Sequence, residues 1–418
     1  MTKAKPPTEP NDEPNNELTN QPIELSATEQ KAAIAREARR VTSYDVAEVA
    51  GVSQSAVSRC FKPGASVSKA TYARVMQAAS LLDYIPNAAA RSLITRRSNM
   101  VAVIIAHRAS LYYPELLAEL SQQFTARGKR VLLFTLEHDS EVDRVLADVW
   151  QFQVDGVIAA VRLGDAHIAE FERRRMPLVL FNHSAGDGGV NTVTCDHPES
   201  GRTLVSRLAA AGHRRFAIIA GADDATEARE RRHGACQRLA ELGLPAPLIV
   251  TGNADYNGGG AGLQAIVEQM GDVPDAILCG SDVMAIGCLD CARHQLGVAV
   301  PARMSVAAFD AVEPSNWLSY NLTTLRQPMP MMAAAAAEML CAVIGDHAAQ
   351  PSPPQRRVFG AQFIEGATAR LAPQSASESA PQPAIESTSG SPSKPASAQA
   401  SAFGGAQVSG MRAPVAIM

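Results

Sequence analysis

The sequence predicts a small all-α helix-turn-helix domain, then an α/β core of two doubly wound parallel-sheet subdomains, with a disordered tail at each end. Residues 41–97 place apolar side chains at helical spacing around a Gly-containing turn. From Met100, short β-branched runs alternate with longer amphipathic segments, a pattern typical of parallel strands that helices cover on both faces. Both ends of the chain are polar and Pro-containing.

The terminal segments, residues 1–38 and 373–418, contain few large apolar side chains. The first is rich in Pro, Asn, Glu and Thr, and the second in Ala, Ser and Pro. Such compositions bury too little apolar surface to offset the entropy cost of folding, so we expect both to be disordered. The first segment also lacks the apolar core of a secretory signal, and no apolar run in the chain reaches the about 18 residues that span a bilayer. A cytoplasmic protein with free thiols on its seven cysteines is therefore expected.

Charge is unevenly distributed along the chain. The formal net charge is −4, but Arg36 to Arg97 contains ten Lys or Arg and four Asp or Glu, a net of +6, which leaves −4 − 6 = −10 elsewhere. A basic segment joined to an acidic body is the pattern of a nucleic-acid-binding module attached to another domain.

Three helices are expected in the basic segment. Thr42 or Ser43 can cap the first helix and Ser53 the second, because a side-chain oxygen there accepts an unpaired backbone N–H. The third extends from about Ser68 to Asp83. In the first two helices the apolar residues recur at i, i+3 and i+4: Val46, Val49 and Ala50, then Val57, Cys60 and Phe61.

A helix, a tight turn and a second capped helix predict a helix-turn-helix that enters the major groove of DNA. Base-edge contacts are expected from the start of the second helix and one turn further on: Gln54, Ser55, Ala56 and Arg59. Phosphate contacts are expected from Ser53, Ser55, Ser58, Lys62 and Tyr44. The alternative is that these residues are only solvated faces of a small helical domain.

The α/β part begins at Met100. Its predicted strands are MVAVIIA, RVLLFTL, DGVIAAV, PLVLFN, RFAIIAG, PLIVTG, DAILCG and MSVAAFD. Predicted helices between them include Pro114–Arg127, Ser200–Ala211 and Ala225–Leu242. The pattern is too long for one ordinary doubly wound domain, so two subdomains with a cleft between them are expected.

These residues resemble the LacI/GalR family of bacterial transcription repressors. The motifs that carry the resemblance are DVAEVAGVS, VSR, YIPN, AARSL, DGVI, GHRR, SDVMAIG and LTTLRQP, and it continues to about Leu371. The resemblance implies a DNA-binding headpiece, a hinge helix and a body with the periplasmic sugar-binding fold. Lys62 stands where asparagine is common in the family, which leaves its contact open.

The resemblance also implies a role for the hinge, Asn87 to Ile94. In the family this segment folds on operator DNA and inserts a leucine from each protomer into the minor groove, and Leu93 occupies that position here. Asn87 and Ala90 are expected at the same interface. The alternative for Leu93 is ordinary packing between helices.

Effector-binding residues follow from the resemblance as well. Arg231, Asp310, Asn182 and Ser281 match positions that meet the ligand, with Ser281 shorter than the asparagine frequent there. Aromatic walls are expected from Tyr112 or Tyr113 and from Tyr256. Arg232 is a rival for Arg231. A surface ion pair for Arg231, a helix cap for Asp310 and core positions for the tyrosines remain open.

The expected organisation assigns a role to each segment. Its parts are a disordered extension (1–38), the helix-turn-helix domain (39–86), a hinge helix (87–98), the effector-binding and dimerisation body (99–372) and a disordered tail (373–418). Within the body, subdomain one comprises about 99–196 and 326–353, and subdomain two about 197–325 and 354–372. The tail lacks leucine heptads, which favours a homodimer over a tetramer.

The expected function is a repressor that binds a pseudo-palindromic operator on double-stranded DNA as a homodimer. A small sugar, sugar acid or related polar metabolite in the cleft controls its operator affinity. No cofactor, metal, membrane or catalytic centre is expected: CLDC (288–291) has no second ligand pair and NGGGAG lacks the Lys of a phosphate loop. A solute-binding protein and an α/β enzyme that uses the same cleft are the alternatives.

Overall fold

The computed structural model describes residues 29, 31, 39–62, 64–86, 97–106, 111, 113–183, 189–221, 225–345, 353–372 and 385–388. The chain forms two compact units: residues 1–100 with 153–155, and the remainder. Most of both predicted tails and residues 87–96 of the predicted hinge lie outside the described residues.

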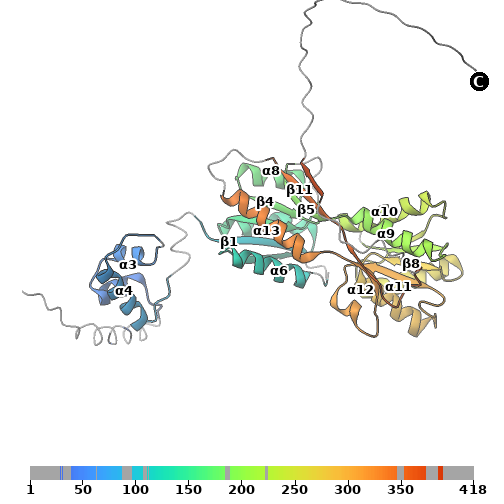
Figure 1. Ribbon diagram of the computed structural model, residues 1–418, viewed down its shortest axis with the longest axis horizontal. Coiled ribbons are helices and arrows are strands. Elements are labelled where there is room, and N and C mark those ends of the chain that lie inside the picture. Colours follow the sequence, from blue (N-terminus) through green and yellow to red (C-terminus); the bar gives the residue numbers. More distant parts are fainter. Residues whose placement is uncertain are drawn as a thin grey trace, which may run out of the picture. The chain divides into compact units, whose positions relative to one another are not determined.

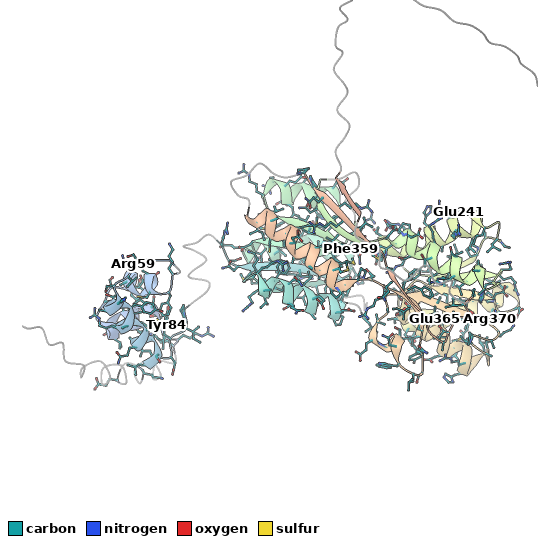
Figure 2. The ribbon with its side chains drawn as sticks, viewed as in Figure 1. Arg59, Tyr84, Glu241, Phe359, Glu365 and Arg370 are labelled. Carbon is teal, nitrogen blue, oxygen red and sulfur yellow. The ribbon has the colours of Figure 1, made fainter. Side chains whose placement is uncertain are left out.

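The first unit is helical, with α2 (Ser43–Ala50), α3 (Gln54–Cys60) and α4 (Lys69–Leu81) (Figure 1). The turn between α2 and α3 requires Gly51, whose φ of 59° lies in the left-handed region. The three helices bury one apolar cluster: Val46, Ala47, Val49, Ala50, Val57, Val75, Ala78, Ala79 and Leu82. Tyr84, labelled in Figure 2, closes the cluster with an edge-on contact to Phe61 at 5.7 Å between ring centroids.

The second unit contains two mainly parallel sheets. The first has the order β13 (Ile385–Thr388), β11 (Gln355–Phe359), β5 (Asn191–Cys195), β4 (Leu178–Phe181), β3 (Gly156–Ala160), β1 (Met100–Ala106) and β2 (Arg130–Leu136). The second has the order β12 (Gln362–Ile364), β10 (Thr323–Arg326), β9 (Ser305–Phe309), β8 (Ala276–Cys279), β6 (Phe216–Ala220) and β7 (Leu248–Thr251). Strands β13 and β12 pair antiparallel with their neighbours, β11 and β10. This architecture confirms the predicted fold class.

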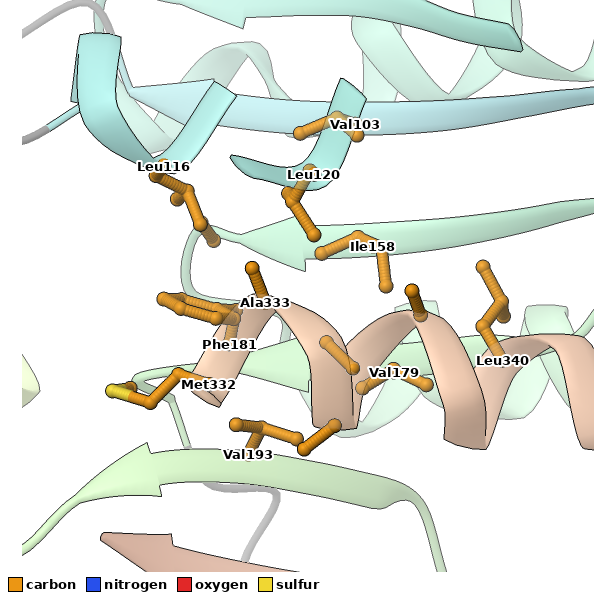
Figure 3. Packing of buried hydrophobic residues seen from close by; sticks show 14 of the residues in the cluster. Val103, Leu116, Leu120, Ile158, Val179, Phe181, Val193, Met332, Ala333 and Leu340 are labelled. Carbon is orange, nitrogen blue, oxygen red and sulfur yellow. The ribbon is translucent and has the colours of Figure 1, made fainter. Parts of the chain in front are cut away.

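Helices bury both faces of the first sheet. On one face, α6 (Tyr113–Ala126) and α13 (Met329–Gly345) pack Leu116, Leu120 and Leu340 against Val103 and Ile158, as Figure 3 shows. Side chains of the opposite face are also buried, among them Ala102, Ile104 and Leu180. The remaining elements of this subdomain are η1 (Asp139–Glu141), α7 (Val142–Gln151) and α8 (Asp165–Arg173).

The second sheet has a separate apolar cluster on each face. One cluster joins it to α11 (Tyr256–Met270) and α12 (Asp282–Asp290), and the other to α9 (His197–Ala210) and α10 (Thr226–Glu241). The short elements η2 (Cys291–Gln295) and η3 (Glu313–Asn316) complete this subdomain. Within the described ranges, no helix is long and apolar enough to cross a membrane.

The predicted end of the body requires a correction. The segment expected as one final strand of subdomain two is two strands: β11 pairs in parallel with β5 of the first sheet, and β12 pairs with β10 of the second. The chain therefore passes between subdomains at Gly360 and Ala361, not at 353–354; Figure 2 labels Phe359 and Glu365 on either side of this passage. The apolar pattern of RRVFGAQFI is continuous, so the sequence does not indicate that its two halves join different sheets.

Candidate functional site

The N-terminal end of α3 presents polar side chains around its cap. The Ser53 hydroxyl accepts the backbone N–H of Ala56 at 3.3 Å and lies 3.0 Å from the Ser55 hydroxyl. Ser55, Arg59 and Lys62 are exposed, and Tyr44 on α2 is 72% exposed. Figure 2 shows Arg59 at the periphery of this unit. These side chains are available to a polyanion.

Two of the predicted base-contacting residues are engaged within the unit. Ala56 is only 9% exposed, because it precedes the core residue Val57 and packs inward with it. The Gln54 amide donates to the Ser43 hydroxyl at 3.2 Å, which ties α3 to α2. Ser58 is half-buried. The remaining predicted DNA contacts, Asn87, Ala90 and Leu93, lie outside the described residues.

A buried carboxylate fixes the start of α2. Both Asp45 oxygens accept from the Arg39 guanidinium at 2.8 Å, and one also accepts the Thr42 backbone N–H at 2.7 Å. The hydrogen bond from Arg39 is the main cause that holds the pKa of Asp45 well below its ordinary range, against the effect of burial. The predicted cap at Thr42 thus acts together with Asp45.

The second unit contains a cavity of about 240 Å³ between its two sheets. Its wall is built where strands end. The lining residues include the last residues of β1 and β2, Ala106 and Leu136, and residues that follow other strands: Val161 after β3, His183 after β4, Gly221 after β6, Gly280 after β8 and Asp310 after β9. Ligands of open α/β sheets bind beyond the carboxyl ends of the strands. The cavity occupies that position in both subdomains.

An ion pair between Arg231 and Asp310 forms part of the cavity wall. Arg231 Nη2 donates to Asp310 Oδ1 at 2.7 Å, and each side chain is only 5% exposed. Arg231 Nη1 donates to the Gly280 carbonyl at 3.0 Å, and the guanidinium lies 4.8 Å from the Phe309 ring centroid. Burial lowers the pKa of Arg231, but the charge and hydrogen bond of Asp310 and the charge of Glu227 more than offset it.

Close packing between α9 and α10 positions Arg231. A β-carbon at Gly201 would lie 2.1 Å from the Arg231 carbonyl oxygen, and one at Gly234 would lie 2.0 Å from that of Pro198. Only glycine at both positions allows the two backbones this distance. The geometry of Arg231 therefore depends on the contact between these helices as well as on its own helix.

A chain of buried hydrogen bonds connects this ion pair to the first subdomain. The Gln327 amide donates to Asp310 at 3.0 Å and its oxygen accepts from Asn182 Nδ2 at 2.7 Å. Asn182 Oδ1 in turn accepts the backbone N–H of Cys195 at 3.0 Å. Asn182, a predicted ligand contact, is used in this network and does not line the cavity.

Ser281 and Asp282 follow β8 and line the cavity at the start of α12. Ser281 caps the helix and accepts from Met284 N at 3.5 Å. Asp282 is fully buried and accepts from the Thr324 hydroxyl at 2.6 Å and from Val312 N at 2.9 Å. Burial, helped by the nearby Asp310 charge, raises the pKa of Asp282 to about 8.

The predicted aromatic walls are only partly realised. Tyr113 lines the cavity, while Tyr112 lies outside the described residues. Tyr256 does not line it: this side chain is 45% exposed and its hydroxyl donates to Asp290 at 2.8 Å. Tyr256 instead lines a surface depression together with Arg293 and Tyr320. The sequence places Tyr256 after a strand, but it does not show which way the packing of α11 on α12 turns this side chain.

Further polar residues line the cavity that sequence reasoning missed. They are Glu137, His138, Arg162, His183, Glu227 and Asp282. Four of them, Glu137, His138, Arg162 and His183, lie within two residues of the end of a strand, so applying the strand-end rule to every predicted strand would have found these four. Arg232, the rival of Arg231, does not line the cavity.

A buried histidine, His197, accepts a hydrogen bond from Arg231. The Arg231 Nε–H points to His197 Nδ1 at 3.4 Å, and His197 is only 1% exposed. Burial, together with the charge of Arg231, lowers the pKa of His197 well below its ordinary value, so this imidazole is neutral.

In the described part of the chain, no group of three His, Cys, Asp or Glu side chains is arranged to hold a metal ion. The arrangement suits binding of a small polar molecule.

Comparisons with protein families match both units of the chain. A model described as bacterial regulatory proteins, lacI family, matches residues 42–87. A model described as periplasmic binding protein-like domain matches residues 205–369. The second match includes Arg231, Ser281 and Asp310 of the cavity wall.

Individual relatives agree with these models. The ribose operon repressor of Escherichia coli strain K12 is 30% identical over 304 residues, which cover 72% of this chain and 92% of the relative. Catabolite control protein A of Priestia megaterium is 28% identical over 305 residues, covering 72% of this chain and 91% of the relative. The first of these relatives is named as the repressor of an operon, and the second as a protein of catabolite control.

Solved structures show the same architecture. The Lac repressor dimer bound to operator and an anti-inducer aligns with a TM-score of 0.72 at 25% identity, covering 80% of this chain and all of that one. The complex of the transcriptional regulator CelR with cellobiose aligns with a TM-score of 0.60 at 26% identity, covering 79% of this chain and all of that one.

Proposed function

The chain belongs to the LacI family of bacterial regulatory proteins, and from that premise we propose that it represses transcription at a pseudo-palindromic operator as a homodimer. A small sugar-like effector in the body controls its affinity for the operator. The observation that carries this function is the presence in one chain of an exposed helix-turn-helix surface and a strand-end cavity with a buried Arg–Asp pair. A cytoplasmic location follows from the proposed target.

The proposed DNA contacts are divided by chemistry. Ser55 in the first turn of α3 and Arg59 in its last turn are exposed and are proposed to contact base edges. Tyr44, Ser53 and Lys62 are proposed to contact phosphates, which position the helix without reading sequence. Ala56 is buried in the structure and is not included among the proposed contacts.

The proposed effector contacts are Arg231, Asp310, Ser281 and Tyr113, because all four line the cavity. Arg231 has five N–H groups, of which three meet Asp310, Gly280 and His197 within the described part of the chain, and the others are proposed to meet ligand oxygens. Asp310 Oδ1 accepts from Arg231 and Gln327, so Oδ2 is the proposed acceptor for a ligand hydroxyl. Such paired donors and acceptors suit the adjacent hydroxyls of a sugar.

The proposed control mechanism is a differential affinity of the effector for two subdomain orientations. Up to β12 the chain passes between the sheets three times, after β5, after β10 and between β11 and β12, which is compatible with hinge closure. A ligand that touches both subdomains favours the closed orientation and shifts the operator-binding equilibrium by the difference in binding free energy.

Footprinting over the promoter of its own gene and neighbouring promoters tests this function. We expect a protected palindrome whose occupancy falls steeply with salt, because phosphate contacts release counterions. Titration with sugars should then change the occupancy. Absence of any protected palindrome would contradict DNA regulation, and turnover of a sugar would instead favour an α/β enzyme.

A further inference from the structure

The cavity wall contains a carboxylate with an unsatisfied oxygen. Glu227 lines the cavity on the first turn of α10, four residues before Arg231 and therefore on the same helix face. Its Oε2 is buried and has no hydrogen-bond partner among the described residues. Buried polar atoms are nearly always hydrogen-bonded, so an exception of this kind requires an explanation.

Arg231 does not satisfy this carboxylate. Its guanidinium is directed to Asp310, Gly280 and His197, and the 2.7 Å contact with Asp310 already pairs its charge. The charge of Glu227 acts on Arg231 only as a smaller contribution after those of burial and Asp310. At this end of the cavity, the one guanidinium is hydrogen-bonded to Asp310 and acts on Glu227 only through its charge.

The charged groups in the described part of the wall also disfavour an anionic ligand. Asp282 accepts two hydrogen bonds from the protein, and its raised pKa of about 8 keeps most of it neutral at pH 7. Apart from the imidazoles of His138 and His183, the remaining ionisable groups of the described lining are three carboxylates, of Glu137, Glu227 and Asp310, and two guanidiniums, of Arg162 and Arg231. An anionic ligand would enter a wall that has an excess of one carboxylate.

We propose that Glu227 is a specificity residue that accepts a hydrogen bond from a hydroxyl or ammonium group of the effector and disfavours anionic effectors. This inference rests on the proposed function, because it assumes that the effector binds in this cavity. A donor from the ligand satisfies Oε2, and a charge-assisted hydrogen bond of this kind is stronger than a neutral one. A carboxylate or phosphate on the ligand would instead face Glu227 with like charge.

The test uses the full chain and matched sugar triplets: glucose, glucosamine and glucuronate, and galactose, galactosamine and galacturonate. Calorimetry is done with the wild type, Glu227→Gln and the control Glu230→Gln; Glu230 lies three residues further along α10 and does not line the cavity. We expect the neutral or amino member to bind more tightly than its acid. Glu227→Gln should weaken that binding about tenfold or more and reduce the discrimination against the acid, while Glu230→Gln changes neither.

Comparison within each triplet shows whether Glu227 accepts from a hydroxyl or from an ammonium group of the ligand. A ligand hydroxyl predicts tightest binding of the neutral sugar, and a ligand ammonium predicts tightest binding of the amino sugar with the larger loss in Glu227→Gln. Tighter binding of the acid, or equal affinity in wild type and Glu227→Gln, would overturn the assignment. If no triplet member binds or alters operator occupancy, the proposal for Glu227 and the sensor part of the proposed function both fall.

A second measurement needs no ligand. Because Oε2 makes no hydrogen bond in the described structure, Glu227→Gln should melt at or above the temperature of the wild type. A fall of more than about 3 °C would show that the carboxylate is already satisfied and would reject the proposal. Operator footprints separate the proposed function from the proposed role of Glu227. If the wild type protects no palindrome, the proposed function is contradicted. If it protects one and Glu227→Gln binds the ligand as tightly as the wild type, only the role of Glu227 is contradicted.

Discussion

The side chains of Asn182 and Gln327 share a buried hydrogen bond of 2.7 Å although 145 residues separate them. Asn182 follows β4 of the first sheet, and Gln327 follows β10 of the second. Since Gln327 also donates to Asp310 at 3.0 Å, the cavity wall is connected directly to the passage between subdomains. This network gives a ligand at Asp310 a physical route to the relative orientation of the sheets.

Gln327→Ala should lower the free energy of unfolding by about 2–4 kcal/mol, because it leaves buried groups of Asn182 and Asp310 without their partner. Urea unfolding measures this loss. Gln151→Ala, at the exposed end of α7, is the matched control and should change stability by less than about 0.5 kcal/mol. Equal effects of the two substitutions would show that the network contributes nothing.

Arg231→Lys should retain operator binding but lower effector affinity about tenfold or more. Lysine keeps the charge, yet it cannot reproduce the planar set of donors to Asp310, Gly280 and His197. Calorimetry with the effector and footprinting on the operator measure the two properties. Arg232→Lys is the control, because Arg232 does not line the cavity; an unchanged affinity in Arg231→Lys would place the ligand elsewhere.

Asp282 should make the body less stable as the pH rises. Its pKa is about 8 in the folded protein against an ordinary 3.8, so the folded state holds a proton that the unfolded state releases between these values. The unfolding free energy contributed by this group therefore falls from about pH 4 to about pH 8 and is constant outside that window.

Melting temperatures of Asp282→Asn and wild type at pH 5 and pH 8 test this sign. Relative to wild type, Asp282→Asn should become more stable as the pH rises. Asp45→Asn is the opposite case: the pKa of Asp45 is depressed, so its contribution changes only in acid and stays constant over pH 5–8. A difference for Asp282→Asn that does not change with pH would reject the raised pKa.

Lys62→Ala should weaken DNA binding on all sequences and reduce the slope of log affinity against log salt by about 0.9. Arg59→Ala should instead relax the preference for the operator over unrelated DNA, since its proposed contact is to a base edge. Fluorescence anisotropy at several salt concentrations measures both. Arg173→Ala, whose partner is Glu170 on α8, should leave both quantities unchanged.

Leu93→Ser should weaken operator binding far more than binding to unrelated DNA. The prediction follows from the family resemblance, in which an apolar side chain at this position unstacks a base step in the minor groove. Competition binding with operator and random duplexes measures the ratio. Equal losses on both duplexes would leave Leu93 without the wedge role.

Local sequence determined the elements and the family of this protein. The helix caps at Thr42 and Ser53, the turn at Gly51 and the buried runs such as MVAVIIA depend on neighbouring residues, and the structure has them where the periodicity predicts. Strands β5 and β10 are absent from the predicted runs because their threonines, Thr192, Thr194, Thr323 and Thr324, interrupt the apolar pattern although all four are buried.

Only the tertiary structure decided which side chains line the cavity and which hydrogen bonds they make. Arg231 and Asp310 meet across 79 residues, and Asn182 donates to Gln327. One buried oxygen of Glu227 has no hydrogen-bond partner within the described ranges. The sequence names these side chains, but burial and hydrogen-bond partners depend on which helices pack together. Arg231 lies in the wall because Gly201 and Gly234 bring α9 and α10 together, and that contact exists only once the second sheet has formed.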